Sequence, residues 1–123
     1  MAQVTLTVCT TCRKTVDGTR VAEEPRPGLR LYEALRAADL PDGVRVIGNE
    51  CLSACDNGCS LVLSGGPERW TYIYSHLDPD THVDEILKGA AAYAATDDGI
   101  VPWRDRPVIF RKQSLARIPP QKD

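Results

Sequence analysis

Five cysteines carry the chemistry that this sequence could perform. Three of them, Cys51, Cys55 and Cys59, fall within nine residues, and the other two, Cys9 and Cys12, form a C-x-x-C motif. The thiolate is both a nucleophile and a soft metal ligand. Thiols at this density therefore indicate covalent pairing, a bound metal or redox chemistry, and the rest of the chain has to bring the two groups together.

The composition narrows these alternatives. The chain has 123 residues, of which 42% are hydrophobic and 26% charged, as expected for one soluble globular domain. A formal net charge of −2 gives no sign of binding to nucleic acid or to an acidic membrane. We find no signal-peptide pattern and no stretch long enough to span a membrane, so we expect a cytoplasmic protein. Cytoplasmic thiols stay reduced, which favours metal binding or redox chemistry over structural disulfides.

The hydrophobic pattern predicts an α/β domain with the element order β-α-β-β-β-α. We expect strands over residues 3–8, 44–48, 60–64 and 70–74, a first helix over 31–38, and a second helix over 78–94 that has Asp78 as its N-cap. Alternation along the fourth strand predicts that Trp70, Tyr72 and Tyr74 serve the core or the surface of the sheet.

The composition changes near residue 98, where prolines begin to interrupt regular pairing. We therefore divide the chain into a domain over residues 1–97 and an irregular C-terminal extension over residues 98–123. The extension is expected to pack on the domain, in part through Trp103 and Phe110, and to end in a frayed tail.

Topology decides whether the two groups of thiols meet. Cys9 and Cys12 follow the first predicted strand, and Cys51 follows the second. If these strands are parallel and joined by the first helix, their carboxyl ends lie at the same edge of a four-stranded mixed sheet. The two groups of cysteines would then lie side by side.

Four thiolates in a C-x2-C and a C-x3-C motif can bind one zinc ion or an iron–sulfur cluster. Zinc ribbons usually repeat C-x2-C twice, whereas a 2Fe–2S cluster needs two close pairs, one for each iron. The small residues Ser53, Ala54, Asn57 and Gly58 suit backbone hydrogen bonds to the sulfides of a cluster. The pattern favours 2Fe–2S, and zinc stays open.

A dithiol oxidoreductase that uses Cys9 and Cys12 is a third, weaker alternative. No predicted helix follows Cys12 directly, so no helix dipole is available to lower the pKa of a nucleophilic thiol there. His76 and His82 lie after the fourth strand, outside the cysteine loops, and we expect them to face solvent or to cap the helix. Arg13, Lys14 and Arg20 are expected to be solvated charges that could also offset a negative cluster or contact an acidic redox partner.

The segment 51–58, which enters a strand and a hairpin, resembles the second cluster loop of the thioredoxin-like 2Fe–2S ferredoxins. That group includes the small cluster-carrying subunit of respiratory NADH dehydrogenase, and its order of elements matches residues 3–96. The whole chain, including segments 88–90, 98–104 and 117–120, more closely resembles a bacterial family of predicted metal-binding proteins of unassigned function.

The resemblance implies a thioredoxin-like fold and a ligand set. Cys9 and Cys12 match the first ligand pair, and Cys51 and Cys55 match the second. Cys59 stands where the ferredoxins commonly have a proline, so it is either an alternative ligand or a fifth thiol beside the cluster. Since it begins the next strand, we expect its side chain to point away from the loop.

These observations predict a small iron–sulfur protein, a one-electron carrier or cluster-bearing module that is not an enzyme. The alternative is a zinc-stabilised or metal-handling binding protein without redox chemistry. The expected partner is a redox protein or a protein of a metallocofactor pathway, with no role for nucleic acid or membrane. The alanines of segment 90–95 permit close packing against the sheet or a second copy, so a homodimer stays open.

Overall fold

The structure is a computed structural model that describes residues 4–11, 15–16, 19–20, 26–50 and 59–120. The helices and strands follow in chain order: β1 (Val4–Cys9), β2 (Thr15–Val16), β3 (Thr19–Arg20), α1 (Pro27–Ala37), β4 (Val44–Asn49), β5 (Leu61–Ser64), β6 (Thr71–Tyr74), α2 (Val83–Ala94), the short 3-10 helix η2 (Trp103–Asp105), α3 (Val108–Lys112) and β7 (Ser114–Ile118). None of the described helices is long and apolar enough to cross a membrane.

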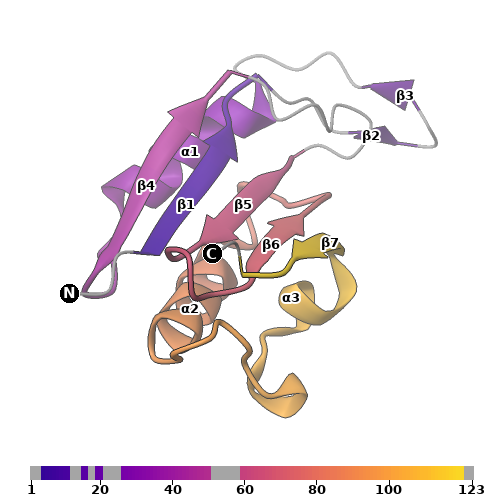
Figure 1. The fold of residues 1–123 in the computed structure, drawn as a ribbon. Helices are drawn as coiled ribbons and strands as arrows, with labels where there is room; N and C mark the ends of the chain where they lie inside the picture. The colour runs from indigo at the N-terminus through magenta and orange to yellow at the C-terminus, as the bar shows by residue number, and fades with distance from the viewer. Residues whose placement is uncertain (1–3, 12–14, 17–18, 21–25, 51–58, 121–123) are drawn as a thin grey trace.

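The main sheet has the strand order β4-β1-β5-β6-β7 (Figure 1). Strands β1 and β4 are parallel, with Val4 opposite Val44 and Cys9 opposite Asn49, and the other neighbours pair antiparallel. The parallel pairing of the first two long strands, on which the site depends, is thereby confirmed. Strands β2 and β3 form a separate two-stranded ribbon.

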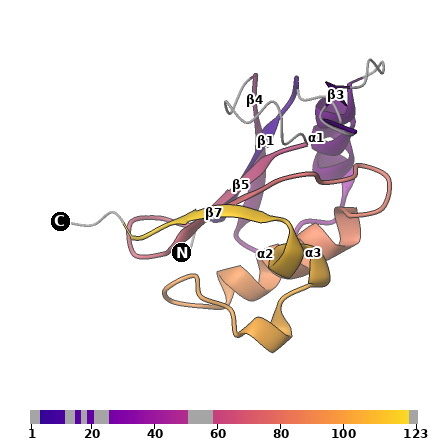
Figure 2. The ribbon, with the colours of Figure 1, turned by 90° about the vertical axis from the view of Figure 1, so that its right-hand side faces the viewer.

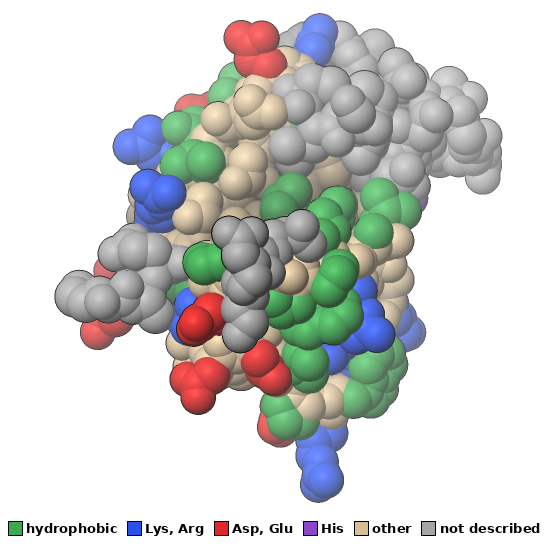
Figure 3. Space-filling model, viewed as in Figure 1, with side chains coloured by type: hydrophobic (Ala, Val, Ile, Leu, Met, Phe, Trp, Pro, Cys, Tyr) green, Lys and Arg blue, Asp and Glu red, His purple; other side chains and the backbone are tan. Residues whose placement is uncertain are grey.

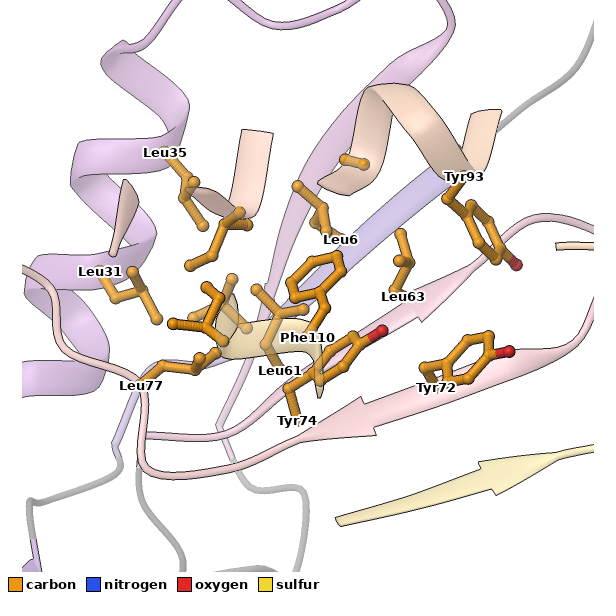
Figure 4. Close-up of a cluster of buried hydrophobic side chains, with 14 of the residues drawn as sticks. Leu6, Leu31, Leu35, Leu61, Leu63, Tyr72, Tyr74, Leu77, Tyr93 and Phe110 are labelled. Atoms are coloured by element: carbon orange, nitrogen blue, oxygen red, sulfur yellow. The ribbon is translucent and has the colours of Figure 1, made fainter. Parts of the chain in front are cut away.

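One hydrophobic core joins the helices to the sheet. Figure 2 shows α1, α2 and α3 on the same side of the sheet, and Figure 4 shows Leu31 and Leu35 pointing from α1 towards the leucines of the strands. Both α1 leucines are fully buried because they lie four residues apart on one face of the helix. The buried cluster also contains these side chains from the other elements: Val4, Leu6, Val8, Leu61, Leu63, Tyr72, Tyr74, Ile86, Tyr93, Ile109 and Phe110.

Both long helices begin at positions other than those predicted. Helix α1 starts at Pro27, before the predicted start at residue 31, because proline at the first helical position has its φ angle already fixed. Helix α2 starts at Val83, and Asp78 is not its N-cap. The carboxylate of Asp78 instead accepts the backbone N–H of Asp80 at 2.8 Å, which forms a turn ahead of the helix.

The C-terminal extension is more regular than its prolines predicted. It contains α3 and β7, and β7 pairs with β6, so the sheet has five strands instead of four. All five residues of β7 are exposed. The strand is therefore held by its backbone pairing with β6, which leaves little hydrophobic signal in the sequence. The domain boundary between residues 97 and 98 stays a prediction.

Phe110, and not Trp103, is the aromatic side chain of the extension that enters the core. The Phe110 ring stacks on Tyr74 with their centroids 4.1 Å apart, whereas Trp103 is 61% exposed. Gly89 of α2 makes room for Phe110, since a Cβ added there would lie 2.0 Å from the Cε2 atom of the ring. The close approach of α3 to α2 thus depends on a glycine.

Candidate metal centre

The carboxyl ends of β1 and β4 lie at the same edge of the sheet, as Figure 1 shows. Cys9 is the last residue of β1, and Asn49 is the last residue of β4. In the sequence, Cys51 follows Asn49 by two residues, and Cys12 follows Cys9 by three. The parallel pairing of β1 with β4 therefore puts Cys9 at the same edge of the sheet as the residues that lead to Cys51.

Four contacts join the two segments at this edge, one of them from the Thr10 hydroxyl to the carbonyl oxygen of Asn49 at 3.4 Å. The backbone N–H of Thr10 donates to the carbonyl oxygen of Asn49 at 2.9 Å. The hydroxyl of Thr11 donates to the carbonyl oxygen of Glu50, and the Cys9 thiol donates to the same oxygen at 3.7 Å. The first cysteine motif is thus bonded to the residue that directly precedes Cys51.

The surroundings of Cys9 combine burial with nearby polar atoms. Cys9 is only 2% exposed, and its Sγ lies 3.9 Å from the Oγ1 of Thr11. The backbone N–H of Cys9 donates to the Ser60 carbonyl oxygen at 3.2 Å. The guanidinium of Arg26 donates to the carbonyl oxygen of Thr11 at 3.3 Å. A positive charge therefore stands beside the first cysteine motif.

Cys59 occupies a different environment. It is fully buried and belongs to the hydrophobic core cluster with Leu61 and Leu77, and its carbonyl oxygen accepts the backbone N–H of Leu77 at 3.1 Å. By the alternation of β1, Cys9 shares the face of Thr5 and Thr7, opposite the core face of the strand. The two cysteines that the structure describes therefore lie in different layers of the molecule.

Other residues of the predicted site lie outside the described part of the chain. These are Cys12, Cys51, Cys55, the small residues of the loop (Ser53, Ala54, Asn57 and Gly58), Arg13, Lys14 and the side chain of Arg20. Within residues 4–11, 15–16, 19–20, 26–50 and 59–120, no group of three or more His, Cys, Asp or Glu side chains could hold a metal ion. The ligand set therefore stays a prediction.

Sequence reasoning missed the residues that hold the two segments together. Thr10, Thr11 and Glu50 do so through contacts between positions 39 to 41 residues apart. Gly48 contributes by its small size, because a Cβ there would lie 2.8 Å from the Cγ2 of Thr10 and 3.1 Å from the Cε1 of Tyr32. A glycine inside a strand pattern is a known sign of such a close approach.

The histidines take the structural roles that we expected. His76 is exposed and has a positive φ angle of 53° in the turn after β6. The Nδ1 of His82 accepts the backbone N–H of Asp78 at 2.9 Å, at the start of α2. Tyr72 and Tyr74 are buried in the core, and Trp70 packs against it, as the alternation of the strand predicted.

Comparison with known proteins places the chain in a family. A family model described as "Protein of unknown function (DUF1636)" matches residues 6–120. The chain belongs to the DUF1636 family. No curated protein matches this DUF1636 chain.

Among solved structures, the DUF1636 chain is similar to a thioredoxin-like 2Fe–2S ferredoxin from Aquifex aeolicus. The TM-score is 0.58, the sequence identity is 16%, and the match covers 100% of both chains. This similarity identifies a thioredoxin-like fold, in agreement with the fold class expected from the sequence.

Proposed function

We propose that the protein binds a 2Fe–2S cluster and acts as a one-electron carrier or cluster-bearing module. The observation that carries the proposal is the contact of the buried Cys9 thiol with the carbonyl oxygen of Glu50, directly before Cys51. This contact joins the first cysteine of the C-x2-C motif to the residue that precedes the C-x3-C motif. The similarity in fold to a 2Fe–2S ferredoxin supports the same proposal.

The residues fit such a cofactor. Cys9 and Cys12 would hold one iron and Cys51 and Cys55 the other, each pair supplying two soft thiolates. The positive charge of Arg26, which donates to the carbonyl oxygen of Thr11, would offset part of the negative charge of a four-thiolate site. When bound, a 2Fe–2S cluster supplies one-electron redox chemistry. The protein needs no substrate pocket for that role, and we propose no catalytic residue.

A zinc-stabilised binding protein is the alternative, because the C-x2-C spacing of Cys9 and Cys12 is also that of a zinc knuckle. The dithiol oxidoreductase has less support. The short strands β2 and β3 follow Cys12, and among the described residues the next helix begins only at Pro27. Thioredoxin-type enzymes activate their nucleophile with a helix N-terminus directly after the motif, whereas the first described element after Cys12 is the strand β2.

Purification under strict exclusion of oxygen tests the proposal. We expect a coloured protein with visible absorption bands and about two iron and two acid-labile sulfide per chain. A colourless protein with about one zinc per chain would show that the zinc alternative is right and the cluster proposal wrong. A metal-free protein that cycles between a dithiol and a disulfide at Cys9 and Cys12 would favour the oxidoreductase.

A further inference from the structure

The exposed apolar side chains of the described residues concentrate in the C-terminal extension. Five of the seven large hydrophobic side chains that are exposed lie between residues 100 and 118: Ile100, Trp103, Val108, Leu115 and Ile118. Figure 3 shows hydrophobic and basic side chains gathered at the lower right of the molecule, where Figure 1 places β7 and α3. A gathering of this kind is typical of a site that contacts another molecule.

The same segment is strongly basic. Residues 103–118 contain Arg104, Arg106, Arg111, Lys112 and Arg117 but only one acidic residue, Asp105, in a chain of net charge −2. Among the described residues, none of these five basic side chains forms an ion pair. The charge of the extension is therefore available to a partner.

Aromatic rings and carbonyl groups hold three of these arginines in place. The Nε of Arg106 donates to the carbonyl oxygen of Val101 at 2.7 Å, and the Nε of Arg111 donates to the carbonyl oxygen of Arg106 at 3.2 Å. The guanidinium of Arg117 lies 4.7 Å from the ring centroid of Trp70. These contacts order the arginine side chains without neutralising their charge. The entropic cost of ordering these side chains when a partner binds is therefore lower.

Strand β7 adds an open backbone edge to this surface. It is the last strand of the sheet, so only one of its edges pairs with a described strand, namely β6. The register shifts between Ile73 and Tyr74, and Ala116, Arg117 and Ile118 then continue in regular pairing. An unpaired edge of this kind accepts an extended segment through backbone hydrogen bonds.

We propose that this surface docks an extended acidic segment of a partner protein, one that carries apolar side chains between its carboxylates. We call the surface the basic edge and define it by Trp103, Val108, Arg111, Leu115, Arg117 and Ile118. The carboxylates would face the arginines, and the apolar side chains would cover Leu115 and Ile118. This site is separate from the cysteine motifs and does not depend on whether they hold iron.

Charge and shape favour an acidic protein segment over other occupants. Pairing two copies through their β7 edges would bring the Arg117 side chains of both copies close together, with like charges opposed. Single-stranded nucleic acid would need several aromatic faces for successive bases to stack on, but Trp103 is the only exposed aromatic side chain among the hydrophobic residues that the structure describes, and Arg106 lies over its ring at 5.5 Å. Helix α3 has five residues, too few to lie on a membrane as an amphipathic helix.

Binding of two matched peptides to the full-length protein tests the proposal. The first is a fluorescein-labelled seven-residue peptide that alternates Glu with Val and Leu, and the second has Lys in place of each Glu. We expect fluorescence anisotropy at low salt to show the acidic peptide binding at least about tenfold more tightly than the basic one. The affinity should fall as salt is added, because the facing charges are exposed.

Three variants separate the contribution of the arginines at the basic edge, the contribution of apolar contact there, and the effect of a more negative net charge. We expect Arg111→Glu with Arg117→Glu to weaken binding by at least about tenfold, and Leu115→Ser to weaken it by about threefold or more. Arg36→Glu reverses an exposed charge on α1 and should leave the affinity within about twofold. Circular dichroism and thermal melting check that each variant is folded.

Several outcomes would overturn the proposal. These are equal affinity for both peptides, no effect of the double charge reversal in a folded variant, or an effect of Arg36→Glu as large as that of the double variant. Tighter binding to a single-stranded oligonucleotide or to anionic lipid vesicles than to the acidic peptide would assign the surface to that other partner. A dimer in sedimentation that Arg117→Glu dissociates would assign it to a second copy.

Discussion

The Cys9 thiol lies 3.7 Å from the backbone carbonyl oxygen of Glu50, the residue directly before Cys51. The two positions are 41 residues apart, and the parallel pairing of β1 with β4 brings them together. The same pairing carries the first cysteine motif to the start of the second. The fold thus places Cys9 beside the residue that leads into the second cysteine motif.

The core position of Cys59 predicts different outcomes for different cysteines. Replacing Cys59 by Ser should leave a coloured protein with nearly full iron, because this thiol lies in the hydrophobic core, away from the Cys9 side of the sheet. Replacing Cys9, Cys12, Cys51 or Cys55 by Ser should remove most of the cluster, since an iron left with one thiolate is weakly held. Iron and sulfide analysis of the anaerobically purified variants measures both effects.

Cys59→Ala serves as a second variant, because Ser places a hydroxyl in an apolar site and lowers stability for that reason alone. Our ligand assignment is wrong if both Cys59 variants fold but lose their iron while Cys55→Ser keeps it. The second pair would then be Cys51 and Cys59.

The hydroxyl of Thr11 should help to hold the site closed. Thr11→Val removes its hydrogen bond to the carbonyl oxygen of Glu50 while keeping the size of the side chain. We expect a loss of about 1 kcal/mol in the free energy of unfolding and a several-fold faster loss of iron to a chelator. Thr7→Val is the matched control, because Thr7 lies within β1 on the same face as Cys9. This variant should change the rate of iron loss little. Equal rates of iron loss in the two variants would show that the Thr11 hydroxyl does not help to hold the site.

A side chain at position 89 should separate α3 from α2. Gly89→Ala places a Cβ 2.0 Å from the Cε2 of Phe110, so the ring must move. We expect a loss of about 1 to 3 kcal/mol in the free energy of unfolding, together with faster proteolysis after residue 98. Combining Gly89→Ala with Phe110→Ala removes the collision, and the cost of the pair should be smaller than the sum of the single costs. Additive costs would show that the ring and Gly89 do not meet in solution.

Stability should fall in alkaline solution because of a buried tyrosine. Burial raises the pKa of Tyr93 from its ordinary value of 10.0 to about 12, although the nearby charge of Arg69 opposes the shift. Burial also raises the pKa of Tyr74 well above its usual range. The folded state therefore holds these protons more tightly than the unfolded state. The resulting stability is present below pH 10 and is lost as the pH rises towards 12.

Urea unfolding between pH 9 and about pH 12 measures this loss, which should be on the order of 2 kcal/mol for Tyr93. Tyr93→Phe removes one of the two titrating groups and should reduce the pH dependence, while the part due to Tyr74 remains. The variant also loses the 2.6 Å hydrogen bond from the Tyr93 hydroxyl to the carbonyl oxygen of Trp70, so it starts from a lower stability. An unchanged pH dependence in the variant would assign the loss to other groups.

The sequence predicted the parts of the fold that rest on local patterns. The four long strands, the two main helices and the parallel pairing of β1 with β4 follow from hydrophobic periodicity and from the handedness of β-α-β units. Strand β7 was missed because prolines surround it and none of its residues is buried, so it carries no hydrophobic alternation. The N-terminus of α2 was misplaced because the Asp78 carboxylate bonds within a turn, an alternative to capping that only the structure distinguishes.

The residues of the site also divide into those that the sequence predicted and those that it did not. Residue type and spacing pointed to Cys9 and to the other cysteines, because metal chemistry requires particular side chains. The roles of Thr11, Glu50 and Gly48 depend on the strand register, which sets contacts between residues about 40 positions apart. Threonines and glutamates are common in every loop, so nothing in the sequence distinguishes Thr11 and Glu50 beforehand. Gly48 is different, because a glycine inside a strand pattern is a sign of close approach.

Electron paramagnetic resonance of the anaerobically purified protein, before and after reduction with dithionite, tests the central claim most directly. The account predicts no signal in the oxidised protein and, after reduction, a low-temperature signal from a single unpaired electron that integrates to about one spin per chain. Cys9→Ser should lose this signal, and Cys59→Ser should keep it. A wild-type protein that stays silent after reduction and contains about one zinc per chain would contradict the account.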